Sequence, residues 1–222
     1  MHFLSAETAS RLITLLASLM LVLQLLLVVQ RMLITNIRLF ALQSLLLVAI
    51  ATVVAVAYGA WHVLVIAVLT FAGKVVFLPW LLTRLVRRIK IEQEITPFVN
   101  MPASMLICGA LTVLSTVVAR PFTSLSRLGS NTLAVALALL LTGFFLMINR
   151  RKALTQVLAL LTTENGVMLA AIALTTYGIP LVVEIGIFLD VIVVVMVLGI
   201  LVFRIRESFD SMDVSKLNEL KW

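Results

Sequence analysis

Seven long apolar segments constrain this chain more than any other feature of its sequence. They lie near residues 8–29, 38–58, 61–83, 100–119, 130–148, 154–176 and 179–203. A helix needs about 20 apolar residues to cross about 30 Å of hydrocarbon, and each segment is close to that length. The sequence therefore predicts an all-α, polytopic membrane protein with about seven transmembrane helices.

The composition supports this class. Of the 222 residues, 63% are hydrophobic and 12% are charged, whereas soluble domains have about 45–50% apolar and about 25% charged residues. The net charge of +7 is therefore attributed to basic residues that flank membrane spans. The lipid bilayer is the expected partner, and no nucleic-acid partner is expected.

The distribution of basic residues predicts how the chain crosses the membrane. With the N-terminus outside, 13 of the 17 Lys and Arg residues fall on the cytoplasmic side. Arg11, Arg120 and Arg127 fall outside, and Lys74 lies within the membrane. Because short cytoplasmic loops are enriched in Lys and Arg, the sequence predicts an N-out, C-in topology.

Three regions are expected along the chain: a four-helix membrane part over residues 1–125, a three-helix part over residues 126–203 and a cytoplasmic tail over residues 204–222. Pro79, in the third apolar segment, removes a backbone hydrogen bond and predicts a kink. The segment Thr83–Pro97 mixes charged and apolar residues, which fits either a solvated loop or a short surface helix.

Lys74, Glu164, Glu184 and Asp190 are charged residues that lie within the apolar segments, away from the segment ends. Each costs at least about 2.5–3.5 kcal/mol in hydrocarbon. Measured at about 1.5 Å per residue from the nearest cytoplasmic basic residue, Lys74 lies about 15 Å deep, Glu164 about 18 Å and Asp190 about 21 Å. These three are expected near the midplane, whereas Glu184, at about 30 Å, is nearer the outer surface.

Titratable groups at one depth, shielded from lipid, are what a lateral proton relay requires. The alternative is that Lys74 pairs with a carboxylate to hold helices together, and the two roles are compatible. Around Glu164, the sequence Thr-Thr-Glu-Asn-Gly at 162–166 is small and polar in mid-span, which favours close helix packing and water binding.

The other polar and sulfur-containing residues indicate no cofactor. Cys108 is the only cysteine and the chain has two histidines, too few for a cysteine-ligated iron–sulfur cluster or a structural zinc site. No cofactor is expected in this chain, so redox chemistry would come from a partner. The polar residues of the first two segments, Gln24, Gln43 and Ser44, are interpreted as packing residues.

Short motifs spread along the chain carry a family resemblance. They are Lys-Val-Val-Phe-Leu-Pro at 74–79, Thr-Glu-Asn-Gly at 163–166, Val-Glu-Ile-Gly-Ile at 183–187 with Asp190, and Met-Asp-Val at 212–214. In this order and spacing, over most of the chain, they resemble component E of hydrogenase-4-type complexes.

The last three segments also resemble the small K subunit of respiratory complex I. That subunit has three helices, N-out and C-in, with one intramembrane glutamate in its second helix and one in its third. Glu164 matches the first glutamate. The second is matched by Glu184 through the following Ile-Gly-Ile, or by Asp190 through its distance from the cytoplasmic end, and both assignments stay open.

The resemblance implies a non-catalytic subunit of an oxidoreductase complex in the inner membrane of a prokaryote. In such complexes antiporter-like and small membrane subunits conduct protons or sodium ions, which implies antiporter-like partners and a relay at Glu164, Asp190, Glu184 and Lys74. A purely structural scaffold is the alternative. A stand-alone secondary transporter is a third hypothesis, disfavoured because few polar groups converge and no pair of broken helices recurs.

Overall fold

A computed structural model describes residues 6–59, 61–89, 97–122 and 130–174, together with Val193, Met196 and Gly199. The elements in these ranges are helical: α1 (Ala6–Val29), α2 (Leu33–Tyr58), α3 (Trp61–Thr70), the π-helix η1 (Phe71–Phe77), α4 (Leu78–Ile89), α5 (Met101–Ala119), the 3₁₀ turn η2 (Arg120–Phe122), α6 (Ser130–Asn149) and α7 (Ala153–Leu174). The segments α3, η1 and α4 follow one another without a break.

Within the described residues, six helical segments are long and apolar enough to cross a membrane. They are Glu7–Val29, Leu33–Ala57, Val63–Arg87, Met101–Phe122, Asn131–Asn149 and Ala153–Leu174. The prediction of an all-α, polytopic membrane protein is therefore confirmed. The seventh expected segment, 179–203, lies outside the described residues except for its three isolated positions.

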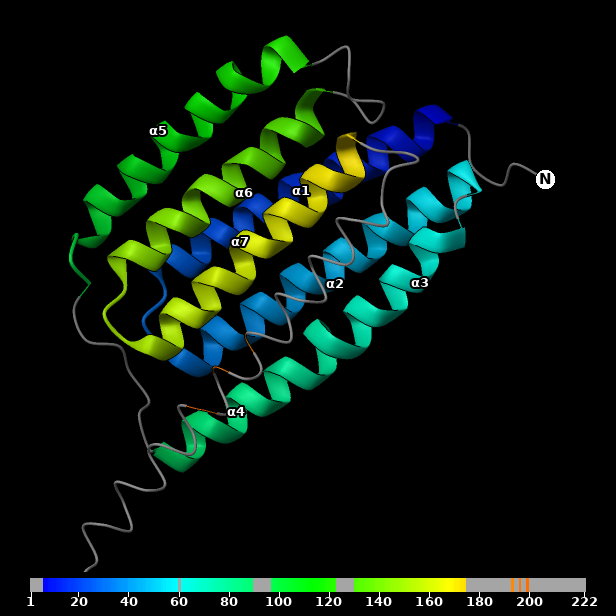
Figure 1. The fold of residues 1–222 in the computed structure, drawn as a ribbon. Helices are drawn as coiled ribbons and strands as arrows, with labels where there is room; N and C mark the ends of the chain where they lie inside the picture. The colour runs from blue at the N-terminus through cyan, green and yellow to red at the C-terminus, as the bar shows by residue number, and fades with distance from the viewer. Residues whose placement is uncertain are drawn as a thin grey trace, which may run out of the picture.

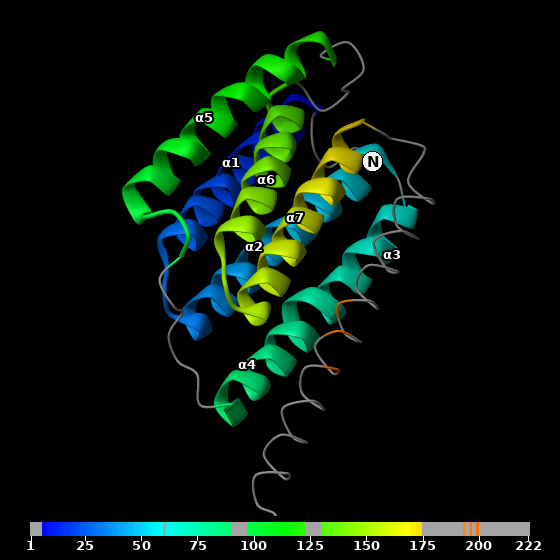
Figure 2. The same ribbon diagram turned by 60° about the vertical axis from the view of Figure 1, so that its left-hand side comes forward.

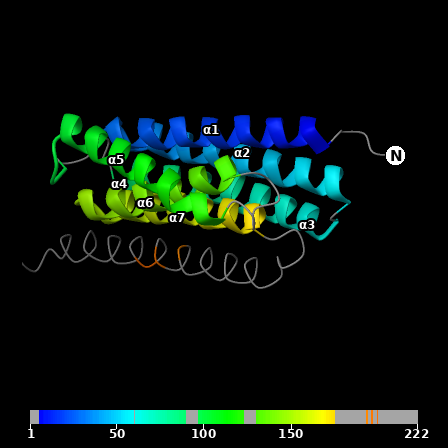
Figure 3. The same ribbon diagram turned by 90° about the horizontal axis from the view of Figure 1, so that it is seen from above.

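The helices form an elongated bundle (Figure 1). The helices α1, α2, α6 and α7 make its centre, where α7 contacts both α6 and α2 (Figure 1). On one flank α5 packs against α6 and α1, and on the other α3, η1 and α4 pack against α2 (Figure 2). Seen from above, α1 lies on one side of the bundle and α6 and α7 lie on the other (Figure 3).

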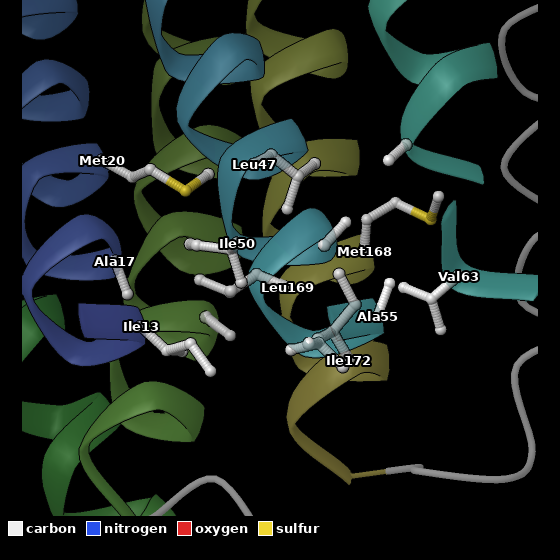
Figure 4. Packing of buried hydrophobic residues seen from close by; sticks show 14 of the residues in the cluster. Ile13, Ala17, Met20, Leu47, Ile50, Ala55, Val63, Met168, Leu169 and Ile172 are labelled. Carbon is white, nitrogen blue, oxygen red and sulfur yellow. The ribbon is translucent and has the colours of Figure 1, made fainter. Parts of the chain in front are cut away.

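Apolar side chains fill the space between the central helices. Figure 4 shows Ile13 and Met20 of α1, Leu47 and Ile50 of α2, and Leu169 of α7 within one cluster. In α7, 72% of the membrane-spanning stretch is buried inside the protein, against 17% in α5. Apolar outward faces suit a hydrocarbon solvent, so α5 is a peripheral helix, whereas α7 is the most buried of the described spans.

Two helices extend beyond the apolar segments that predicted them. The helix α2 begins at Leu33 rather than near residue 38, and α4 continues to Ile89. In α4, Leu85 and Val86 are buried whereas Arg84 and Arg87 are exposed, so an amphipathic stripe continues the helix into the basic segment. Residues 83–89 of the segment Thr83–Pro97 are therefore helical, and residues 90–96 lie outside the described ranges.

Arg150 joins the connection between α6 and α7 to the end of α1. Its side chain is buried, and its guanidinium donates hydrogen bonds to the backbone carbonyls of Leu27 at 2.7 Å, Val28 at 3.1 Å and Gln30 at 3.0 Å. The last carbonyls of a helix have no donor within the helix. Arg150 therefore caps α1, a role beyond the topology signal expected from its charge.

The antiparallel order of the helices gathers basic residues at one end of the bundle. Arg31 lies between α1 and α2, Arg87 near the end of α4, and Arg150 and Arg151 between α6 and α7. The N-out, C-in orientation, in which this end faces the cytoplasm, stays a prediction.

Candidate functional site: a buried ion pair between Lys74 and Glu164

Lys74 lies in the one π-helical segment of the described residues, η1. The π-helical turn is wider than an α-helical turn, because the backbone N–H of Leu78 donates to the carbonyl of Gly73, five residues earlier. Pro79 follows at once and has no N–H to donate, so the regular hydrogen-bond ladder is interrupted here. The expected effect of Pro79 was a kink, and the structure records a π-helical turn before the proline. Such turns are frequent at functional sites.

Lys74 faces into the bundle and meets Glu164 of α7. The distance from Lys74 Nζ to Glu164 Oε1 is 2.9 Å, and the two side chains are only 1% and 3% exposed. Lys74 is the buried residue of η1, while Phe71 and Phe77 on the same segment are exposed. Two expectations are thus confirmed: Lys74 is shielded from lipid, and it lies within reach of a carboxylate at similar depth.

Small residues bring α7 close to its neighbour α6. A Cβ atom on Gly143 of α6 would lie 3.0 Å from the backbone Cα of Thr163 and closer still to its hydroxyl. The side chain of Thr163 donates to the carbonyl of Ala159 in its own helix at 2.9 Å. The polar, small sequence at 162–166 therefore permits the close approach that it predicted.

Asn165 extends the ion pair toward α2. The ammonium of Lys74 donates to Asn165 Oδ1 at 3.4 Å. The amide nitrogen of Asn165 donates in turn to Gln43 Oε1 at 3.3 Å and to Ser44 Oγ at 3.1 Å. All of these side chains are buried, so α2 is tied to α7 through polar groups that apolar residues enclose.

The same hydrogen-bonded network continues to α1 and returns to α7. Gln43 Nε2 donates to Gln24 Oε1 at 3.0 Å, and Gln24 Nε2 donates to Thr162 Oγ1 at 3.4 Å. Along this series, from Lys74 to Thr162, each amide accepts a hydrogen bond from the preceding side chain and donates one to the next. Hydrogen bonds arranged head to tail polarise one another, and here the acceptor end of each amide faces the ammonium side.

Interpreting Gln24, Gln43 and Ser44 as packing residues missed this network. The signal was available, because Gln24 and Gln43 are polar residues inside two apolar segments. Depth counted along the sequence does not group Gln43 with Glu164, because Gln43 lies only five residues past Arg38, about 8 Å. In the structure α2 begins at Leu33, which places Gln43 about 15 Å from the helix start.

Two of the expected relay residues, Glu184 and Asp190, lie outside the described residues. The structure therefore brings together Lys74 and Glu164, and it leaves the choice of the second carboxylate as it stood. In the described ranges no group of three or more His, Cys, Asp or Glu side chains gathers as metal ligands would.

The chain is similar to hydrogenase-4 component E of Escherichia coli K12, with 31% identity over 217 residues, which cover 96% of this chain and 99% of that protein. The chain belongs to the hydrogenase-4 component E family. A component E of the same name from Shigella flexneri matches over the same length at 31% identity.

The chain is also similar to a mycobacterial protein. An uncharacterized protein of Mycobacterium tuberculosis is 34% identical over 187 residues, which cover 83% of this chain and 84% of that protein. No family model matches the chain, and no solved structure matches it either. Because the component E match extends nearly end to end, it covers both Lys74 and Glu164.

Proposed function

We propose that this chain is an integral membrane subunit of a hydrogenase-linked, complex-I-like assembly. In this role it joins antiporter-like subunits in the inner membrane and contributes a midplane relay for protons or sodium ions. Its membership in a family named for a hydrogenase component supports the assembly, and six apolar helices of membrane-spanning length support the location. Residues 126–203 would form the part similar to the complex I K subunit.

The ion pair between Lys74 and Glu164 is the observation that carries the relay. Replacing a buried ion pair by apolar residues is often neutral or stabilising, so stability alone gives no reason to place two charges in this position. Ionisable groups inside a membrane commonly mark ion pathways. Lys74 and Glu164 are the groups assigned to the relay, with Glu184 or Asp190 as the next carboxylate.

The structural scaffold is the competing function, and the same contact favours it. A direct distance of 2.9 Å across two helices is what an interhelical linkage requires, and the amide network around it adds further links between α1, α2 and α7. The two functions differ in whether the carboxyl group has to titrate.

A Glu164→Gln variant separates these functions. Glutamine keeps the volume and an oxygen that can accept from Lys74, but it removes the titrating group and the charge that pairs with Lys74. A relay therefore predicts that the complexes that still assemble lose ion uptake into membrane vesicles. A scaffold predicts that uptake per assembled complex persists. Glu7→Gln is the matched control, because Glu7 is an exposed carboxylate paired with Arg11, and neither function predicts an effect there.

The assembly itself is tested by the proteins that stay bound after gentle detergent solubilisation. Antiporter-like membrane proteins together with hydrogenase subunits are the expected set. Purification of the chain as a single species from cells that express those subunits would contradict the proposed assembly.

A further inference from the structure

A small cavity lies between α1, α2, α6 and α7, near the end of the bundle that holds Arg150. Its volume is about 10 Å³, and four of its lining residues are polar: Asn36, Arg150, Thr155 and Thr162. The other lining residues are leucines. All four polar side chains are at least nine-tenths buried, so the cavity is lined by polar groups that lie inside the protein.

Asn36 has a buried oxygen whose hydrogen-bonding capacity the described protein groups do not use. Its amide nitrogen donates to the carbonyl of Gln30 at 3.3 Å. Its Oδ1 atom is buried and accepts no hydrogen bond from any group of the described residues. Leaving such an acceptor unsatisfied destabilises the folded protein, and a ligand with a hydrogen to donate would remove that cost.

We propose that this cavity binds one water molecule. A cavity needs about 10–15 Å³ to hold a water and about two to four polar partners, and the site meets both conditions. The water would donate to Asn36 Oδ1 and to a threonine hydroxyl oxygen, and it would accept from the guanidinium of Arg150. A cation is disfavoured because the lining includes Arg150 and no carboxylate, and an anion is disfavoured because the unsatisfied group, Asn36 Oδ1, is an acceptor.

The water extends the polar network to the basic end of the bundle. Thr162 lines the cavity and also accepts the hydrogen bond from Gln24. One water therefore links the series that begins at Lys74 with Arg150, which caps α1. Thr162 lies about 14 Å from the start of α7 and Glu164 about 17 Å, so the bound water approaches the depth of the ion pair.

This site deepens the proposed function, on which its role rests. If Lys74 and Glu164 relay ions, the water gives them a polar approach from the end predicted to face the cytoplasm. The water site itself stands on cavity volume, burial and the acceptor of Asn36, and it can be tested separately.

The test is hydroxyl-radical footprinting of the intact complex in lipid nanodiscs, with X-ray pulses and ¹⁸O-labelled water. Radicals formed from bound water oxidise the side chains beside it. Leu146 and Leu158 line the cavity, and we expect them to incorporate ¹⁸O several-fold faster than Leu139, which is fully buried in the apolar cluster. Equal rates at the three leucines would overturn the water site.

Variants make the assignment specific. Asn36→Leu removes the acceptor and fills the cavity, so the labelling of Leu146 and Leu158 should be lost. Thr142→Val, at a buried hydroxyl that bonds within α6, should leave it unchanged. Persistent labelling in assembled Asn36→Leu complex contradicts the proposal, and if that variant fails to assemble, the wild-type comparison of the leucines decides.

The Glu164→Gln variant separates this inference from the proposed function. Its labelling should match the wild type, because the substituted side chain is not part of the cavity lining. Absent labelling with blocked ion uptake would reject the water and keep the relay. Normal labelling with normal uptake would reject the relay and keep the water.

Discussion

A Cβ atom on Gly166 of α7 would lie 2.8 Å from the backbone nitrogen of Leu140 in α6. Residues two apart in an α-helix are separated by about 200° around the axis, so a helix that turns Gly166 toward α6 turns Glu164 to the opposite side. Lys74 lies on that side, 2.9 Å from Glu164. The close approach of α6 and α7 thus fixes the direction of the buried carboxylate.

Gly166→Ala is expected to destabilise the protein, because the added methyl group overlaps backbone that cannot move away like a flexible side chain. Overpacking of this kind costs about 1–3 kcal/mol. Gly109→Ala on α5 is the control, since a Cβ there meets no atom within 4 Å and alanine favours the helix by about 1 kcal/mol. Thermal denaturation of the purified protein in detergent measures both, and equal midpoints would contradict the prediction.

Lys74→Leu should destabilise the bundle strongly, by about 3–5 kcal/mol, because it leaves the Glu164 carboxylate buried without its cation. The double variant Lys74→Leu with Glu164→Leu should recover part of that loss, since it removes both charges. A double-mutant cycle on denaturation midpoints gives the coupling between the two side chains. Additive effects of the single changes would show that the ion pair contributes no coupling.

Gln43→Leu interrupts the amide network at its centre, because Gln43 contacts both Gln24 and Asn165. Each buried partner left unsatisfied costs about 1–3 kcal/mol. Thr52→Val is the comparison on the same helix, since its hydroxyl bonds only to the carbonyl of Val48 among the contacts described. A denaturation midpoint that falls for Gln43→Leu and stays near wild type for Thr52→Val is the expected result.

Arg150→Gln should lower stability by at least about 1–3 kcal/mol, because it removes the charged donor from the last carbonyls of α1. Arg151→Gln makes the same change of charge one residue later, where the exposed guanidinium lies 4.3 Å from the ring of Phe98. The Arg151→Gln variant should change the free energy of unfolding by only a few tenths of a kcal/mol. If both variants behaved alike, charge and not capping would explain the effect.

The N-out, C-in orientation predicts opposite labelling of two serines changed to cysteine. In a Cys108→Ala background, Ser126→Cys should react with a membrane-impermeant thiol reagent from outside intact cells. Ser215→Cys should react only after the membrane is opened, because the tail follows the basic residues at 204 and 206. Labelling of Ser215→Cys from outside would reverse the topology.

The fold class and the matching depth of Lys74 and Glu164 could be predicted from the sequence. The first depends on the length of apolar runs, and the second on the number of residues from the helix end. Run length predicted six helices that the structure describes, and rise per residue placed Lys74 and Glu164 at matching depths. Helix ends were harder to predict. The helix α4 continues to Ile89 because its last residues are amphipathic, and a search for continuous apolar runs does not detect such a segment. The capping role of Arg150 depends on which carbonyls lie beside it in space, and no local pattern encodes that.

The π-helical turn at Lys74 also corrects the phase of a long helix. Thr70, Lys74 and Leu78 are all buried and spaced four residues apart, and in a regular α-helix each such step overshoots a full turn by about 40°. The wider π-helical turn compensates for that overshoot. The buried face that begins in α3 therefore continues on the same side of α4. The placement of one cation and the registry of two apolar faces therefore depend on the same π-helical turn.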